Sequence, residues 1–310
     1  MESSELYHVK QQFFLGAYKS LIDLTLPDPN SPDYIPTLLY QARAHIASND
    51  PSAALSLVPE DSENVAVKAV AALARYVAAS ADDAKDAALE ALRDLLIEVE
   101  GDDAEGNEKE RALVRVLAGT AFARAGEIEE ALDALGSQTE DLEAVAVLVH
   151  IYLSINRPDL AKREFDRAKH WAEDDLLLQL IECNIGLVTG KDAYSNPQSF
   201  YTEQLGNPSL SSPHILTARG VTRILRNEFQ AARSDIEEAM QQNAGDAEAL
   251  AAYAVAASLA PQQKGEADEL FARLQAEHPE HPLVADVAAK ASVFDEFAAK
   301  FSVPPVAAAA

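Results

Sequence analysis

Several residue types and patterns are scarce in this 310-residue chain, and each scarcity excludes a class of protein. A single cysteine excludes a disulfide framework and a cysteine-rich zinc site. Basic residues number 25 against 51 acidic ones, and the net charge of −26 opposes binding to nucleic-acid phosphates or to an anionic membrane surface. No apolar run approaches the roughly 20 residues of a membrane-spanning helix. Residues 1–28 lack a basic start followed by an apolar core, so we expect no secretory leader and a cytosolic location.

Alanine is the most informative residue that is present. The chain has 58 alanines and only 12 glycines, and alanine has the highest intrinsic helix propensity. A hydrophobic share of 48% is enough to offset chain entropy, which argues against global disorder. Strand signals are scarce, because no Asn-Gly or Asp-Gly turn and no long alternating run occurs. The composition therefore predicts an all-α fold.

The helical pattern recurs along the chain with a nearly constant period. The clearest helix pairs have a small residue at the crossing and an aromatic residue one turn away, as at Gly119 and Phe122, whereas the pattern is weakest at Leu21 and Pro197. The small position of each second helix repeats at a mean spacing of about 35 residues, close to the tetratricopeptide period of about 34. These positions are Leu21, Ala54, Ala88, Ala131, Ala161, Pro197, Ala232 and Ala267. The competing interpretation is a globular helical bundle with chance spacing.

The repeat predicts one elongated architecture. We expect a tetratricopeptide-like helical repeat array, a curved α-solenoid of about eight repeats over residues 1–302, with a C-terminal capping helix at 283–301 and a flexible tail at 303–310. Two places depart from the period. The acidic stretch at 98–110 is expected to be a mobile loop, and an irregular corner is expected around 192–197 because Pro197 does not suit a helix interior.

The candidate motifs for catalysis or metal binding lack the spacing or context that such sites need. GLVTGK at 186–191 has three residues between its glycines where a phosphate-binding loop needs four. His278 and His281 lie in a proline-bounded stretch that is typical of a loop, and Cys183 lies in an apolar helix, where a free thiol behaves as a small hydrophobe. The acidic run at 98–110 lacks the ligand spacing of an EF-hand loop. We therefore expect no enzymatic activity, no cofactor and no metal.

The first helix of each repeat predicts the functional surface. In tetratricopeptide arrays these helices line a concave groove, and here their inward positions are largely apolar. An apolar groove left empty is an aggregation liability, so we expect a long-lived partner that supplies an amphipathic helix or a strand pair. The alternative for some of these side chains is packing against neighbouring helices. The predicted groove residues are Leu39, Val70, Leu73, Val77, Leu113, Val116, His150, Leu153, Thr217, Val221 and Ile224.

The same surface offers a second candidate function, that of a co-chaperone or other scaffold adaptor. Co-chaperone adaptors of this architecture bind a peptide carboxylate with several cations on their first helices. Here the corresponding faces offer Arg43 and little else, so the carboxylate clamp is incomplete.

Four segments carry a family resemblance. The opening resembles the start of the epsilon subunit of coatomer at Val9, Lys10, Phe13, Phe14, Gly16 and Tyr18. Residues 157–169 and 176–190 are similar to a repeat and the following helix of that family, and residues 281–297 resemble its final His-Pro and Phe-Asp pattern. The acidic stretch at 98–110 and the region at 194–197 depart from the family pattern.

The resemblance implies a non-catalytic subunit of the COPI vesicle coat. It implies that the coatomer alpha subunit, through its C-terminal region, is the direct partner and that other coatomer subunits are contacted indirectly. It also implies retrograde transport from Golgi to endoplasmic reticulum and within the Golgi, with recruitment to Golgi membranes as part of the coat. The acidic charge argues against a nucleic-acid partner and against direct membrane insertion.

Overall fold

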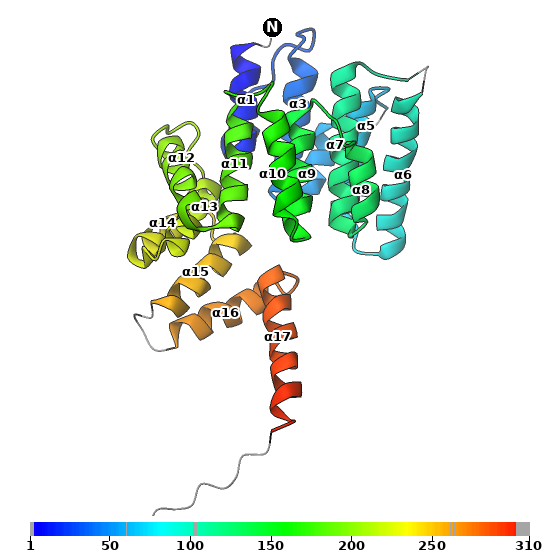
Figure 1. Ribbon diagram of the computed structural model, residues 1–310. Coiled ribbons are helices and arrows are strands. Elements are labelled where there is room, and N and C mark those ends of the chain that lie inside the picture. Colours follow the sequence, from blue (N-terminus) through cyan, green and yellow to red (C-terminus); the bar gives the residue numbers. More distant parts are fainter. Residues whose placement is uncertain (1–2, 60, 102–103, 261, 263–264, 302–310) are drawn as a thin grey trace, which may run out of the picture. The chain divides into compact units, whose positions relative to one another are not determined.

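The computed structural model describes residues 3–59, 61–101, 104–260, 262 and 265–301, and every regular element in this part of the chain is a helix. The chain divides into two compact units, residues 1–215 and 216–310, which are described separately (Figure 1). The helices of each unit follow one another as antiparallel pairs, as the repeat predicts.

Compact unit 1 contains six successive helix pairs within the described residues. Their second helices differ strongly in length, from five residues in α2 to nineteen in α6. The bounds are α1 (Ser4–Phe14), α2 (Tyr18–Ile22), α3 (Tyr34–Ala47), α4 (Pro51–Leu57), α5 (Val65–Ala78), α6 (Asp82–Glu100), α7 (Glu108–Ala125), α8 (Ile128–Leu135), α9 (Leu142–Ser154), α10 (Pro158–Ala168), α11 (Leu176–Thr189) and α12 (Ser195–Leu205), with a short 3-10 helix η1 (Lys191–Tyr194) before α12.

Compact unit 2 begins within α13 (Pro213–Leu225) and continues through α14 (Phe229–Gln242), α15 (Ala247–Leu259) and α16 (Glu266–Glu277). The chain then forms α17 (Pro282–Ala298), which the sequence predicts as a capping helix. The core of this unit joins Leu250 of α15, Leu274 of α16 and Val284 of α17. The prediction of one continuous superhelix through residue 302 stays a prediction, and the tail at 303–310 lies outside the described residues.

Close helix crossings explain the repeated small residues. A Cβ added to Gly119 would lie 2.6 Å from Cγ of Leu135, and one added to Gly220 would lie 2.7 Å from Cγ1 of Ile236. Each glycine therefore lets a first helix approach its second helix more closely than any side chain permits. The alanines on the opposing helices are equally enclosed, and four of them have no exposed surface: Ala54, Ala131, Ala161 and Ala232.

The turn between the two helices of a repeat also recurs. A residue with positive φ stands immediately after the first helix or one residue beyond it at Asn49, Gly126, Asn156 and Asn227. Glycine adopts this left-handed conformation without strain, and asparagine tolerates it better than other side chains. The same turn is thus encoded by Asn in three repeats and by Gly in one.

The structure corrects two predictions made from the interrupted period. The acidic stretch at 98–110 is not one mobile loop, because α6 continues to Glu100 and α7 begins at Glu108. Glu110 closes a capping box with Asn107, and residues 102–103 lie outside the described residues. The expected irregular corner is also largely helical. Pro197 stands third in α12, in the first turn, where the missing N–H has no helical acceptor to lose.

Candidate interaction surface

The structure places most of the predicted groove residues in the interior. Val70 has no exposed surface, and Val116 is only 3% exposed. Four others are equally buried: Leu39, Leu73, Thr217 and Ile224. Four are half-buried, namely Val77, Leu113, Leu153 and Val221, and only His150 is exposed. A partner-binding role for these eleven residues stays a prediction.

Packing between successive first helices buries these side chains. Leu39 of α3, Val70 and Leu73 of α5 and Val116 of α7 belong to one continuous apolar cluster in compact unit 1. Leu113 packs against the same cluster from its edge. The inward faces of α3, α5 and α7 therefore meet one another, which is the alternative that the sequence left open for part of the set.

A buried ion pair joins two repeats that are distant in the sequence. Arg43 of α3 donates from Nη2 to Oε2 of Glu143 of α9 at 2.5 Å, and the Tyr40 hydroxyl donates to Oε1 of the same carboxylate. The Arg43 guanidinium also lies over the ring of Phe13, 4.5 Å from its centroid, and over the ring of Tyr40 at 5.0 Å. We call Arg43, Glu143, Tyr40 and Phe13 the α3–α9 clasp.

The clasp perturbs the protonation of its members. Burial alone would raise the pKa of the Glu143 carboxyl, but the charge of Arg43 and the hydrogen bonds from Arg43 and Tyr40 hold that pKa below its ordinary value. Burial, followed by the negative charge of Glu143, raises the pKa of Tyr40 well above its ordinary value. Both shifts favour an ionised Glu143 and a neutral Tyr40, which is the hydrogen-bonded arrangement.

The N-terminal helix is fastened inside compact unit 1. Ser212 donates from its hydroxyl to the carbonyl of Leu15 at 2.6 Å, and Gln12 donates to the carbonyl of Ser209 at 3.4 Å. Gly16 has φ of 69°, and a Cβ there would lie 2.7 Å from Cβ of His214. Residues 12–16 thus contact a segment almost 200 residues later in the chain.

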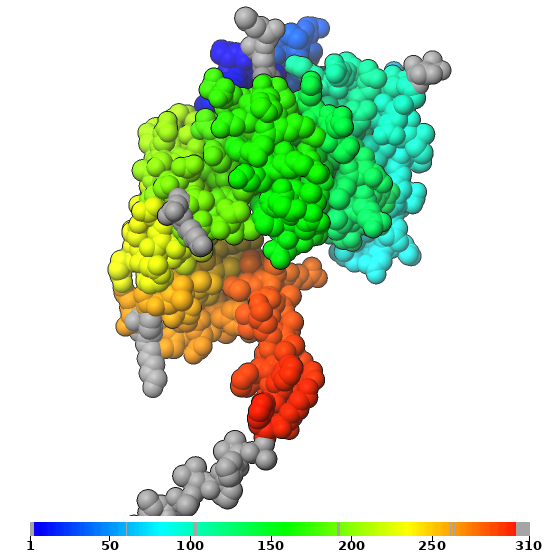
Figure 2. Space-filling model, viewed as in Figure 1, coloured from blue at the N-terminus to red at the C-terminus, as the bar shows by residue number. Residues whose placement is uncertain are grey.

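Several exposed apolar side chains lie close together on α17 and just after it. Of its 17 residues only Val284 is buried, and the second half of the helix carries three large apolar side chains in solvent, with a fourth just after its end. The exposed fractions are 52% for Val293, 72% for Phe294, 54% for Phe297 and 76% for Phe301, which follows α17. Figure 2 shows the atoms of this helix standing clear of α15 and α16 over most of its length.

The His and Cys residues that the sequence singles out have structural roles. His281 accepts from the backbone N–H of Leu283 and so caps α17, and His278 ends α16. Burial raises the pKa of the Cys183 thiol to about 12, which leaves little thiolate at neutral pH. Among the described residues, no group of three or more His, Cys, Asp or Glu could hold a metal ion, and no helix has the length and apolarity to cross a membrane.

Similarity to known proteins identifies the family. A solved tetratricopeptide repeat protein from Parabacteroides merdae aligns with a TM-score of 0.54 at 13% identity, covering 80% of this chain and 95% of that one, which confirms the predicted repeat fold. Coatomer subunit epsilon-1 of Arabidopsis thaliana is 28% identical over 96% of this chain and 97% of its own length. Coatomer subunit epsilon of Caenorhabditis elegans is 26% identical over 96% and 98%.

The family model of the coatomer epsilon subunit matches residues 2–302, almost the whole chain. This match confirms the resemblance carried by Phe13, Phe14 and the C-terminal Phe-Asp pattern. Coatomer subunits of this family are structural components of the COPI vesicle coat. The chain belongs to the coatomer epsilon subunit family.

Proposed function

We propose that this chain binds and stabilises the C-terminal region of the coatomer alpha subunit. In this role it acts in retrograde transport from Golgi to endoplasmic reticulum and within the Golgi, without catalysis. It is cytosolic, and within the coat it is peripheral on Golgi membranes and COPI vesicles. Other coatomer subunits are reached through the alpha subunit, and neither nucleic acid nor membrane insertion is involved.

The exposed apolar row of α17 is the observation that carries this proposal. Phe297 stands four residues after Val293 and three after Phe294, so these exposed side chains follow one face of α17, and exposed Phe301 comes just after the helix. Soluble chains rarely leave such a face uncovered, and an amphipathic helix with this spacing is typical of helix-in-groove recognition. A permanent partner that covers α17 removes this aggregation liability.

The first helices contribute a second, smaller part of the proposed surface. Val77, Leu113, Leu153 and Val221 keep part of their side chains accessible, and His150 is exposed. The six buried members of the predicted groove pack the interior, and a partner reaches them only where neighbouring helices separate. The proposal therefore assigns direct contact first to the accessible five.

The co-chaperone adaptor alternative loses its remaining support. Its carboxylate clamp would need Arg43, which is 9% exposed and already pairs with Glu143. A peptide carboxylate would have to displace Glu143 from a site where Arg43 also stacks on Phe13. No specific observation favours that function.

Enclosure of an apolar partner explains a stabilising role. Obligate interfaces commonly bury on the order of 2,000 Å² or more, and a partner that binds only folded chains stabilises both by mass action. We therefore expect the melting temperature of each chain to rise in the complex.

Co-purification of the full chain with a tagged C-terminal region of the alpha subunit tests the proposal. The double substitution Phe294→Ser and Phe297→Ser is expected to abolish capture, because it removes two large apolar contacts. The matched control is Asp286→Ser with Lys290→Ser, which changes two exposed residues of the same helix and should preserve capture. Undiminished capture of the Phe variant, with an unchanged melting temperature of the mixture, would overturn the proposal.

A further inference from the structure

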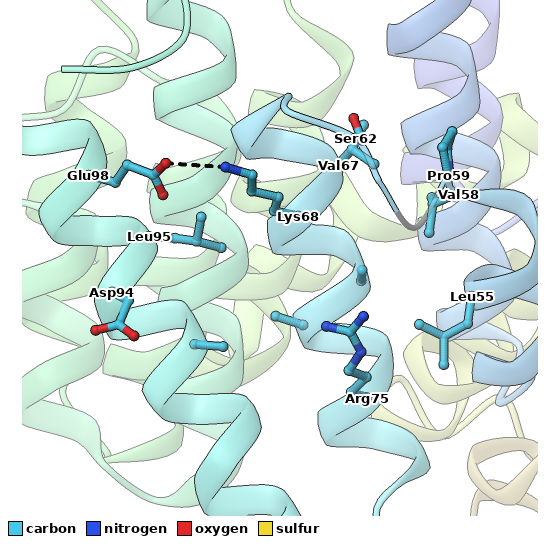
Figure 3. A pocket seen from close by; sticks show the side chains of 13 residues that line it. Leu55, Val58, Pro59, Ser62, Val67, Lys68, Arg75, Asp94, Leu95 and Glu98 are labelled. Atoms are coloured by element: carbon cyan, nitrogen blue, oxygen red, sulfur yellow. Dashed lines mark hydrogen bonds and ion pairs between the residues drawn. The ribbon is translucent and has the colours of Figure 1, made fainter.

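A groove opens between the second helices of two adjacent repeats in compact unit 1. It lies over α5 and is bounded by α4 on one side and α6 on the other, with a cavity volume of about 350 Å³ (Figure 3). Volumes of this order hold a few amino-acid side chains and fall at the lower end of ligand pockets. The groove is a different place from the surfaces of the proposed function.

Helix length and small residues create the groove. The α4 helix has 7 residues and α6 has 19, so α4 covers only part of the surface of α5 beside it. The floor is built from Ala71 and Ala72, whose short side chains leave the space unfilled. Leu55 of α4 and Leu95 of α6 form apolar walls. The groove therefore offers an apolar floor to a side chain of another molecule.

Helical geometry places the groove opposite the predicted concave face. Lys68, Ala71 and Arg75 are spaced by three and four residues and follow one face of α5. Val70 and Val77 stand two residues after Lys68 and Arg75, which turns them by about 200° around the axis. A ligand in the groove thus leaves the opposite face of α5 untouched.

The two basic side chains at the rim of the groove differ in whether they already form an ion pair. Arg75 is exposed and forms no ion pair or side-chain hydrogen bond with the residues that the structure describes, although acids outnumber bases twofold in this chain. Lys68 pairs with Glu98 at 3.2 Å, but both side chains are about one-third exposed, so water and salt weaken this bridge. Asp94 lies across the groove on α6 and points away from Arg75 (Figure 3).

We propose that this groove binds a short peptide segment in which a leucine-sized apolar side chain stands beside a carboxylate. The apolar side chain enters the trough over Ala71 and Ala72, and the carboxylate accepts hydrogen bonds from the Arg75 guanidinium. Charge-assisted bonds of this kind are roughly twice as strong as neutral ones, and arginine binds carboxylates in a bidentate manner. Lys68 adds a second, weaker attraction for the peptide carboxylate once its ion pair with Glu98 has broken.

Fluorescence anisotropy with three labelled peptides tests the proposal on the full chain. The probe has a Leu-Leu-Asp-Glu core, and the two comparison peptides have Leu-Leu-Asn-Gln and Ser-Ser-Asp-Glu cores. The probe is expected to bind about tenfold more tightly than either comparison peptide, because each lacks one of the two required contacts. Equal binding of the three peptides, or no binding at protein concentrations up to about 1 mM, overturns the proposal.

Two matched variants locate the binding. Arg75→Gln is expected to reduce affinity for the probe about tenfold and to erase its preference over the Asn-Gln peptide. Arg124→Gln, an exposed arginine near the end of α7, should change neither value. An unchanged affinity of the Arg75→Gln variant would overturn the assignment. Concentration-dependent self-association that this variant abolishes would also overturn it, since the occupant would then be a second copy of the chain.

Discussion

The α3–α9 clasp and the end of α17 differ in which side chains they expose to solvent. In the clasp, charged Arg43 and Glu143 are enclosed, whereas in α17 the aromatic Phe294 and Phe297 stand in solvent. Buried charges persist only when they are paired, and exposed aromatic rows persist only when something covers them. The difference teaches that the first region is completed within the chain, while the second is the face that we propose a partner covers.

Removal of one clasp partner should have the largest effect. Glu143→Ala leaves the Arg43 guanidinium buried without its partner, and we expect the free energy of unfolding to fall by about 3–5 kcal/mol. Urea denaturation measures this value. The double variant Arg43→Ala with Glu143→Ala should lose less than the sum of the single variants. Asp159→Ala, which breaks the exposed Arg157–Asp159 pair, should leave stability nearly unchanged, and a large loss there would contradict the comparison.

A substitution at the apolar crossing of α7 and α8 should lower the free energy of unfolding by an intermediate amount. Gly119→Ala places a methyl group within 2.6 Å of Leu135, so either the Leu135 side chain or the two helices must shift, and we expect the free energy of unfolding to fall by about 1–3 kcal/mol. The control is Gly245→Ala, where the nearest atom is 4.0 Å from the added Cβ. Thermal melts of both variants make the measurement. Equal melting temperatures would show that this crossing is not closely packed.

Acid should weaken the clasp selectively. The pKa of Glu143 lies below its ordinary value in the folded chain, so the unfolded chain takes up this proton first as the pH falls. The contribution of Glu143 is therefore complete above the unfolded pKa and is lost as the pH falls from about 5 through the folded pKa. Urea midpoints of the native chain and of Glu143→Gln should differ at pH 7 and converge toward pH 3. If the two urea midpoints differed by the same amount from pH 7 to pH 3, the ionisation of Glu143 would not be the cause of the difference.

The smallest effect on stability is expected at α17. Phe297→Ser alters a side chain that is 54% exposed, so the free energy of unfolding of the isolated chain should change by less than about 0.5 kcal/mol. Binding of a hydrophobic dye should nevertheless decrease. A loss of several kcal/mol would mean that Phe297 packs within the chain.

The repeat could be predicted because its signals are local. Gly119, Ala131 and Ala232 report helix crossings through their size and spacing alone. The boundaries around 98–110 and 192–197 could not be predicted well, because an acidic composition is compatible with a longer α6, and a proline is tolerated in the first turn of α12.

The interaction surface was less predictable than the fold. Apolar first-helix residues such as Val70 and Val116 suit a groove and an interior equally, and only the meeting of α3, α5 and α7 decides between them. Glu143 was missed as the partner of Arg43 because 100 residues separate them and no local pattern links them. The sequence predicts α17 only as a capping helix. The periodic spacing of its apolar residues indicates a helix face but does not indicate what covers that face.

The α3–α9 clasp also has a consequence for folding. In a simple repeat array each repeat contacts only its neighbours, so repeats can unfold singly from an end. Here the second repeat is tied to the fifth, and the intervening chain forms a loop that must close before the ion pair exists. Closing so long a loop slows folding, since non-local contacts are costly to form. Once it has formed, we expect the repeats between α3 and α9 to unfold together, as a globular domain does.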